Sequence, residues 1–179
     1  DSFILLTFLL FMLIVFLRFQ NLEMLVDPLT GLGNRRRMQL YIDKLSRKRK
    51  GEFSAIVFDI DDFKDINDLY GHIYGDRVLI VISKILEKSA GNKKITCIRY
   101  GGDEFIVITP KEEVNEFIAK FKKLLSEFND HKEFPSKIDV SIGVSEFTVN
   151  SEINMEYIIN TADKLMYEKK KLKKRNSNK

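Results

Sequence analysis

The sequence predicts an α/β fold of the α+β sandwich type, in which helices pack on a mainly antiparallel sheet. The hydrophobic pattern predicts the order helix, strand, two helices, two strands, helix, strand and helix. The two adjacent strands flank Gly101-Gly102-Asp103, and two extended runs around a Gly-Gly pair are typical of a β-hairpin. Because a hairpin pairs neighbouring strands directly, an antiparallel sheet is favoured over a doubly wound parallel one.

Each element follows from its own pattern. Apolar residues at spacings of three and four predict helices at residues 34–47, after Gly75, at 111–128 and at 153–173, and a polar segment predicts a short helix at 61–70. Short runs of branched and aromatic residues predict strands at residues 53–59, 95–100, 104–109 and 138–144. Residues 111–128 show the strongest pattern, because seven apolar residues form one unbroken stripe there: Val114, Phe117, Ile118, Phe121, Leu124, Leu125 and Phe128.

Composition indicates one compact domain with a short appendage. Among 179 residues, 44% are hydrophobic and 31% charged, which is an ordinary globular balance. The excess of positive charge is only +4, so nucleic acid is not an expected partner. The one cysteine, Cys97, lies in an apolar stretch with no cysteine to pair with, and a reducing compartment is the simplest setting.

The first segment is apolar on all sides. Residues 3–17 contain a single polar residue, Thr7, but fall short of the roughly twenty residues that cross a bilayer as a helix. We interpret residues 1–18 as the end of a transmembrane helix, followed by a connector at 19–26 and a folded domain at 27–179. A signal-peptide core and a buried helix are the alternatives. Arg18 and the three arginines at 35–37 predict that the domain is cytoplasmic.

An acidic segment follows the strand at residues 53–59. Asp59 ends this apolar strand, where a carboxylate has no packing role and can be held rigidly for a hard cation such as Mg²⁺. A solvated surface loop is the alternative interpretation. A calcium-binding loop is excluded, because Phe63 and Tyr70 occupy positions that need oxygen ligands.

The predicted hairpin carries a second acidic pair. Gly101 and Gly102 allow a tight turn with positive φ and let a ligand approach the backbone closely. The adjacent carboxylates of Asp103 and Glu104 repel each other unless a cation neutralises them. From these local features alone, an ordinary turn is an equally good interpretation.

Several spaced motifs together resemble the GGDEF family of diguanylate cyclases. Residues 100–105 (YGGDEF) are similar to the signature of that family. The resemblance continues in residues 27–32 (DPLTGL), 34–36 (NRR), 58–76 (FDIDDFKDINDLYGHIYGD), 141–144 (SIGV) and 162–170 (ADKLMYEKK). It covers residues 27–174, and it identifies both acidic segments as parts of one site.

The resemblance implies a palm-like, ferredoxin-type domain that holds one GTP. It implies that Asp59, the Ile60 carbonyl, Asp103 and Glu104 hold two Mg²⁺ ions, with Mn²⁺ as a substitute, and that Asp103 and Glu104 are catalytic. The signature turn is formed by Gly101 and Gly102.

The resemblance also implies a substrate site. Asn67 and Asp76 would recognise guanine, while Lys64, Lys170 and Lys174 would neutralise the β- and γ-phosphates, with Asp62 and Phe63 completing the site. The alternatives are helix N-caps for Asn67 and Asp76 and a solvated helix end for the C-terminal lysines.

The implied reaction needs two copies of the domain. A homodimer would bring two GTP molecules together to form cyclic di-GMP and two pyrophosphates, as the output of a sensor in the bacterial inner membrane whose N-terminal part precedes this sequence. The Arg-x-x-Asp feedback site of many relatives is absent, because residues 92–95 read NKKI. Two other functions remain open: a module that binds GTP or cyclic di-GMP without turnover, and a structural dimerisation domain.

Overall fold

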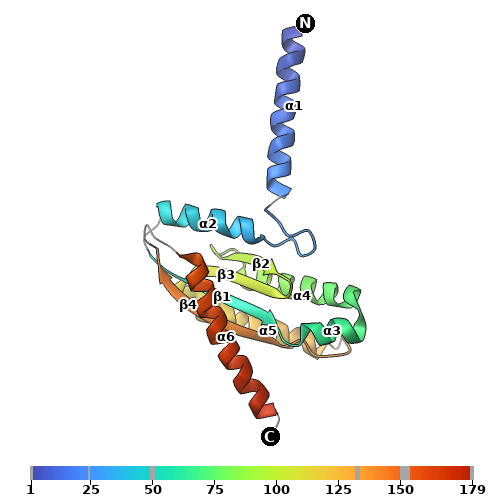
Figure 1. Ribbon diagram of the computed structural model, residues 1–179, viewed down its shortest axis with the longest axis vertical. Coiled ribbons are helices and arrows are strands. Elements are labelled where there is room, and N and C mark those ends of the chain that lie inside the picture. The colour runs from blue at the N-terminus through green and yellow to red at the C-terminus, as the bar shows by residue number, and fades with distance from the viewer. Residues whose placement is uncertain (1, 24, 49–50, 132–133, 150–153, 178–179) are drawn as a thin grey trace.

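A computed structural model describes residues 2–23, 25–48, 51–131, 134–149 and 154–177 (Figure 1). The helices are α1 (Ser2–Glu23), α2 (Arg35–Lys48), α3 (Phe63–Tyr70), α4 (His72–Ala90), a 3₁₀ turn η1 (Lys111–Glu113), α5 (Val114–Asp130) and α6 (Met155–Ser177). The strands are β1 (Glu52–Ile60), β2 (Thr96–Gly101), β3 (Glu104–Pro110) and β4 (Val140–Thr148).

The four strands form one sheet in the order β2-β3-β1-β4, and all of its pairs are antiparallel. The predicted α/β fold with an antiparallel sheet and flanking helices is therefore confirmed. β1 lies in the interior of the sheet and is buried along most of its length, which explains its continuous apolar sequence. Its neighbours are β3 on one side and β4 on the other.

Two hydrophobic cores cover the two faces of the sheet (Figure 1). On one face, Phe58 of β1 packs against Phe117 and Phe121 of α5, with ring centroids 6.1 and 4.8 Å apart. On the other face, Val57 belongs to a core shared with α2 and α6. Because side chains alternate along a strand, Asp59 points to the same face as Val57, toward α6.

The described boundaries differ from the predicted ones most clearly at α4 and α1. α4 begins at His72, so Gly75 and Asp76 lie inside this helix rather than before it. The N-cap interpretation of Asn67 and Asp76 is therefore wrong, because both residues are within helices. α1 extends to Glu23 and thus includes most of the predicted connector.

Helix α1 projects away from the domain (Figure 1). Its described side chains are exposed and, apart from Thr7, apolar; the exposure of the large apolar ones runs from 76% at Phe3 to 42% at Val15. Within the residues that the structure describes, no helix is both long enough and apolar enough to cross a membrane. The assignment of residues 1–18 to the end of a membrane span stays a prediction.

Candidate active site

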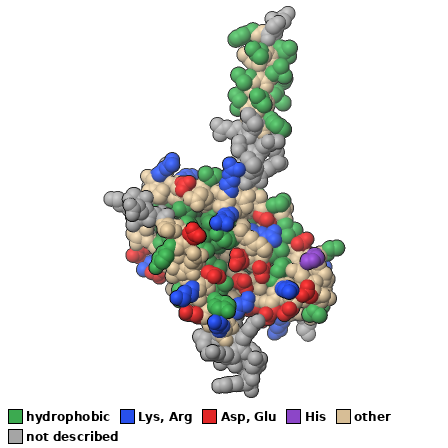
Figure 2. Space-filling model, in the orientation of Figure 1, with side chains coloured by type: hydrophobic (Ala, Val, Ile, Leu, Met, Phe, Trp, Pro, Cys, Tyr) green, Lys and Arg blue, Asp and Glu red, His purple; other side chains and the backbone are tan. Residues whose placement is uncertain are grey.

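The acidic residues from distant parts of the sequence meet at one end of the sheet. Asp59 of β1 lies directly opposite Glu104 of β3, and Asp103 precedes Glu104 in the turn between β2 and β3. The register follows from the antiparallel pairing, which brings the last residues of β1 beside the first residues of β3. Acidic side chains gather on the face that α6 crosses, with basic side chains around them (Figure 2).

Lys170 of α6 provides a positive charge at this cluster. Its ammonium group forms an ion pair with Asp59 and lies 3.4 Å from the carboxylate of Asp61. Asp61 also accepts a hydrogen bond of 2.6 Å from the Ser141 hydroxyl. Burial lowers the pKa of Lys170, but the two carboxylates outweigh it and raise the pKa, so the side chain stays charged.

The two acids of the Gly-Gly turn, which we define as residues 101–104, are poorly neutralised. Burial raises the pKa of Asp103 above its ordinary value of 3.8, and the charge of Asp59 raises it further. Burial also raises the pKa of Glu104 above 4.5, as do the charges of Asp163 and Asp103. An added cation would therefore relieve an existing repulsion at this site.

These residues fit a hard divalent cation in their chemistry, although they do not form a complete cage. Among the described residues, no group of three His, Cys, Asp or Glu side chains is arranged to hold an ion. Mg²⁺ is usually held by one or two carboxylates together with substrate phosphates and water, so a complete protein cage is not required. Asp59 already pairs with one cation, the Lys170 ammonium. The Ile60 side chain is buried, and any part of Ile60 in the site is left to its backbone carbonyl.

The Gly-Gly turn has an irregular backbone. Gly102 adopts a positive φ of 50°, whereas Gly101 does not, so the expected positive φ applies to one glycine only. The pairing register between β2 and β3 shifts between Arg99 and Gly101. A Cβ atom at Gly101 or Gly102 would meet no heavy atom within 4 Å, so the turn is open to an approaching ligand.

The predicted guanine-binding residues lie on α3 and α4. Asn67 is half-buried and packs against Gly75, where a Cβ atom would come within 2.0 Å of the Asn67 side-chain oxygen. Asp76 and Lys64 are exposed. Asp62, the N-cap residue of α3, adopts a left-handed φ of 54° and is the one described non-glycine residue with positive φ.

The structure adds three residues to the site that lie within the sequence motifs but had no predicted role: Asp61, Ser141 and Asp163. Asp61 lies beside the Lys170 ammonium and accepts a hydrogen bond from the Ser141 hydroxyl, and the charge of Asp163 acts on Glu104. Two signals in the sequence point to them: Asp61 lies two residues after Asp59, and Asp163 lies seven residues before Lys170, about two helical turns. The side chain of Lys174 lies outside the described residues, so its predicted role stays untested.

The hollows on the domain surface only partly coincide with these residues. A hollow of about 560 Å³ between α4 and α5 contains none of the predicted site residues. Another, of about 480 Å³, includes Gly101 and Gly102 together with the basic side chains of Arg35, Arg36 and Arg99. Geometry and charge therefore indicate the site better than the size of a hollow does.

Comparison with known families decides what kind of domain this is. Residues 24–177 match the model of the family described as "Diguanylate cyclase, GGDEF domain". The chain belongs to the GGDEF family. Diguanylate cyclase A from Treponema denticola is 37% identical over 137 residues, which cover 73% of this chain and 36% of that protein. An uncharacterized membrane protein from Staphylococcus aureus is 31% identical over 158 residues, covering 84% of this chain and 44% of that protein.

Solved structures show the same GGDEF fold. The coiled coil and GGDEF domain of DgcB from Caulobacter crescentus, in complex with c-di-GMP, has a TM-score of 0.78 at 24% identity, covering 92% of this chain and 90% of that one. Diguanylate cyclase SiaD from Pseudomonas aeruginosa, in complex with its activator SiaC, has a TM-score of 0.72 at 24% identity, covering 93% and 67%. This GGDEF chain spans less than half the length of the curated relatives named above.

Proposed function

We propose that this GGDEF domain is a diguanylate cyclase, which joins two GTP molecules into cyclic di-GMP and releases two pyrophosphates. The observation that carries the proposal is the cluster of Asp59, Asp103 and Glu104 beside an open Gly-Gly turn, with the Lys170 ammonium among the acids. A dimerisation domain would not need half-buried like charges, which cost stability. Membership of the GGDEF family and the similarity to Diguanylate cyclase A support the proposal.

In this proposal the acidic residues hold the reacting groups in line. Asp59, Asp103 and Glu104 would hold Mg²⁺, with the Ile60 carbonyl as a further oxygen ligand. When bound, Mg²⁺ lowers the pKa of a coordinated hydroxyl and neutralises charge on phosphates. In each half-reaction a bond forms between O3′ of one GTP and the α-phosphorus of the other, and the bond to the pyrophosphate oxygen breaks. Asp103, whose pKa is raised, accepts the hydroxyl proton directly or through water.

Asn67 and Asp76 would select the base. Guanine offers two donors, N1–H and the exocyclic amine, and a carboxylate accepts from both. Lys64 and Lys174 would neutralise the outer phosphates. Lys170 would do the same once a divalent cation takes its place beside Asp59, and Asp62 and Phe63 would shape the entrance to α3.

The test is an incubation of the whole chain with GTP and Mg²⁺, followed by chromatography of the products. Cyclic di-GMP should form with wild-type protein and be lost in Asp103→Asn, which preserves the size of the side chain. Glu112→Gln, which alters an exposed acid on η1, is the matched control and should keep full activity. GTP binding without any product in the wild type would instead support a binding module.

We also propose that the active form is a homodimer. One chain carries one set of site residues, whereas a cyclic product needs two activated α-phosphates that face each other. Specific activity should therefore rise with protein concentration. An excess of Asp103→Asn protein should inhibit the wild type, because a mixed dimer has one defective half. Specific activity that does not depend on concentration would count against the dimer.

We further propose that α1 tethers the domain to the bacterial inner membrane, as part of a longer sensor that places the domain in the cytoplasm. The exposed apolar side chains of α1 and the name of the Staphylococcus aureus relative support this proposal. The whole chain should float with liposomes, and a Leu9→Lys, Leu13→Lys double variant should not. Equal flotation of both proteins would contradict the tether.

A further inference from the structure

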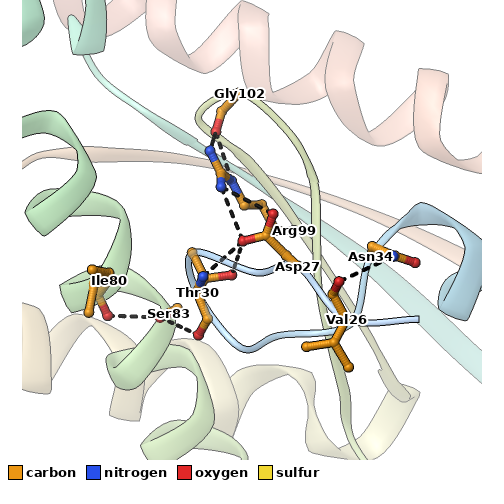
Figure 3. Close-up of polar contacts among 8 residues, drawn as sticks. All are labelled: Val26, Asp27, Thr30, Asn34, Ile80, Ser83, Arg99 and Gly102. Carbon is orange, nitrogen blue, oxygen red and sulfur yellow. Dashed lines mark hydrogen bonds and ion pairs between the residues drawn. The ribbon is translucent and has the colours of Figure 1, made fainter. Parts of the chain in front are cut away.

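Arg99 connects two segments that lie far apart in the sequence (Figure 3). Its Nε and Nη2 atoms donate hydrogen bonds of 3.1 and 2.9 Å to the Gly102 carbonyl oxygen. Its Nη1 atom lies 3.1 and 3.2 Å from the two carboxylate oxygens of Asp27. The side chains of both charged residues are mostly enclosed, at 15% and 18% exposure, so the ion pair is only weakly screened by solvent.

The guanidinium group compensates for a gap in the sheet. Ladder pairing between β2 and β3 is irregular from Arg99 to Gly101, so regular pairing does not fix the backbone of the Gly-Gly turn. Gly102 itself is free to adopt many conformations. Two donors from one rigid, planar group onto its carbonyl restrict that freedom, and Asp103 is the next residue in the chain.

The Asp27 end of this arrangement is itself held firmly. The backbone N–H and the hydroxyl of Thr30 donate hydrogen bonds of 2.9 and 2.6 Å to the Asp27 carboxylate. The backbone N–H of Asp27 donates to the Leu32 carbonyl at 2.8 Å, and that of Arg99 donates to the Gly33 carbonyl at 2.8 Å. Burial raises the pKa of Asp27, but the hydrogen bonds from Thr30 and Arg99 outweigh it and lower the pKa, so the carboxylate is charged.

We propose that Arg99, oriented by Asp27, is a positioning residue that fixes the Gly-Gly turn and thereby the carboxylates of Asp103 and Glu104. The inference rests on the proposed cyclase function for its effect on turnover, and on geometry alone for its effect on the turn. A lysine at this position keeps the positive charge beside Asp27 but lacks the planar fork that reaches two partners at once. A purely stabilising ion pair requires only the charges.

The experiment uses the whole chain in detergent micelles, labelled with ¹⁵N-glycine. The chain contains nine glycines, and the signal that disappears in Gly102→Ala assigns the Gly102 amide. Arg99→Lys and the exchanged pair Asp27→Arg, Arg99→Asp are compared with wild type. Lys93→Gln, which breaks a surface ion pair with Glu116, is the control. The measurements are the Gly102 amide shift, the Mn²⁺ dissociation constant, the melting temperature, and kcat and KM for GTP.

Arg99→Lys should move the Gly102 amide signal, weaken Mn²⁺ binding and lower kcat by about 10- to 100-fold, with KM changed by less than about threefold, because a misplaced catalytic group costs turnover. The exchanged pair should have a melting temperature close to that of wild type, because the ion pair is kept. Its kcat should stay low and its Gly102 amide signal should stay displaced, because an aspartate at position 99 cannot donate to a carbonyl. Lys93→Gln should match wild type in all four measurements.

Two results would overturn the positioning role. One is that Arg99→Lys has the same kcat and the same Gly102 amide signal as wild type. The other is that the exchanged pair has wild-type values of both, which would mean that Arg99 and Asp27 form only a stabilising ion pair. If wild-type protein makes no cyclic di-GMP, the proposed function fails. The Gly102 signal and Mn²⁺ binding then still decide whether Arg99 positions the turn.

Discussion

Asp59 and Glu104 lie directly opposite each other on the neighbouring antiparallel strands β1 and β3. Like charges in this arrangement destabilise a strand pair, and at Asp59 the Lys170 ammonium offsets the charge. The cluster therefore favours binding a further cation over remaining empty. This relationship leads to the first two predictions.

Divalent cations should stabilise the folded chain through Asp59. At about one hundred times its dissociation constant, Mg²⁺ or Mn²⁺ should raise the free energy of unfolding by about 2.7 kcal/mol. Asp59→Asn should lose most of this gain, whereas Glu112→Gln should keep it. Thermal unfolding with and without the cation measures the effect, and an equal gain in Asp59→Asn and wild type would contradict the assigned site.

Removing the Glu104 charge should stabilise the cation-free chain in a pH-dependent way. Burial and the charges of Asp163 and Asp103 raise the folded-state pKa of Glu104 above the ordinary value of 4.5, which holds in the unfolded state. At a pH between the unfolded-state and folded-state pKa, the folded state therefore binds more protons than the unfolded state. Wild type thus loses stability as pH rises through this window, and Glu104→Gln does not. The advantage of the variant should be larger at about pH 7 than at about pH 4.

Denaturant unfolding in EDTA at both pH values measures that difference. Asp27→Asn provides the opposite control, because the folded-state pKa of Asp27 is lowered. The Asp27 carboxylate contributes to the free energy of unfolding at pH values above its unfolded-state pKa, and this contribution is lost as the pH falls through its folded-state pKa. A Glu104→Gln advantage that shrinks with rising pH would refute the raised pKa of Glu104.

Gly143 should be needed for α6 to reach the sheet. A Cβ atom there would lie 2.0 Å from the Ala162 carbonyl oxygen of α6, a backbone atom that cannot move without the helix. Gly143→Ala should destabilise the chain by about 1–3 kcal/mol or more, as overpacked sites do. Gly101→Ala meets no atom within 4 Å and is the matched control for unfolding measurements. Equal stabilities of the two variants would rule out this close contact.

Gly75 should control the position of Asn67. Alanine inside a helix is favoured over glycine by about 1 kcal/mol, but a Cβ at position 75 would meet the Asn67 side-chain oxygen at 2.0 Å. Gly75→Ala should therefore change stability little, displace Asn67, and raise KM for GTP by about tenfold, as the loss of one good hydrogen bond does. Steady-state kinetics test this, and an unchanged KM would remove Asn67 from the base site.

Asp76 should determine the choice of base. Asp76→Asn replaces one of the two acceptor oxygens by an NH₂ group, which is a hydrogen-bond donor. Guanine presents donors here, N1–H and the exocyclic amine, so a donor would face a donor. The preference for GTP over ATP and over inosine triphosphate, which lacks the exocyclic amine, should fall by about 10- to 100-fold in kcat/KM. Asp68→Asn, at a nearby exposed acid, should leave the preference intact. An unaltered preference in Asp76→Asn would mean that other groups recognise guanine.

The sequence by itself determined the secondary-structure elements and predicted which residues form the acidic site. Apolar spacing gave the helices and strands, and the Gly-Gly pair between two extended runs predicted the hairpin, because these patterns are local properties of the chain. Asp59 stood out because a carboxylate at the end of an apolar strand has no packing role, whereas local features left Asp103 and Glu104 equally compatible with an ordinary turn. The resemblance of the spaced motifs to the GGDEF family then joined the three acids in one predicted site. Helix boundaries were less certain: α4 begins at His72, because the helix can include Gly75 where Asn67 packs against it.

Only the tertiary structure decided which charges meet. Lys170 pairs with Asp59 across 111 residues because Gly143 lets α6 approach the sheet, and no local pattern encodes that distance. In the same way, the Arg99 guanidinium reaches Asp27 across 72 residues and the Gly102 carbonyl within its own hairpin. Long-range pairing depends on how whole elements pack, so the balance of charge at the site becomes visible only in the folded chain.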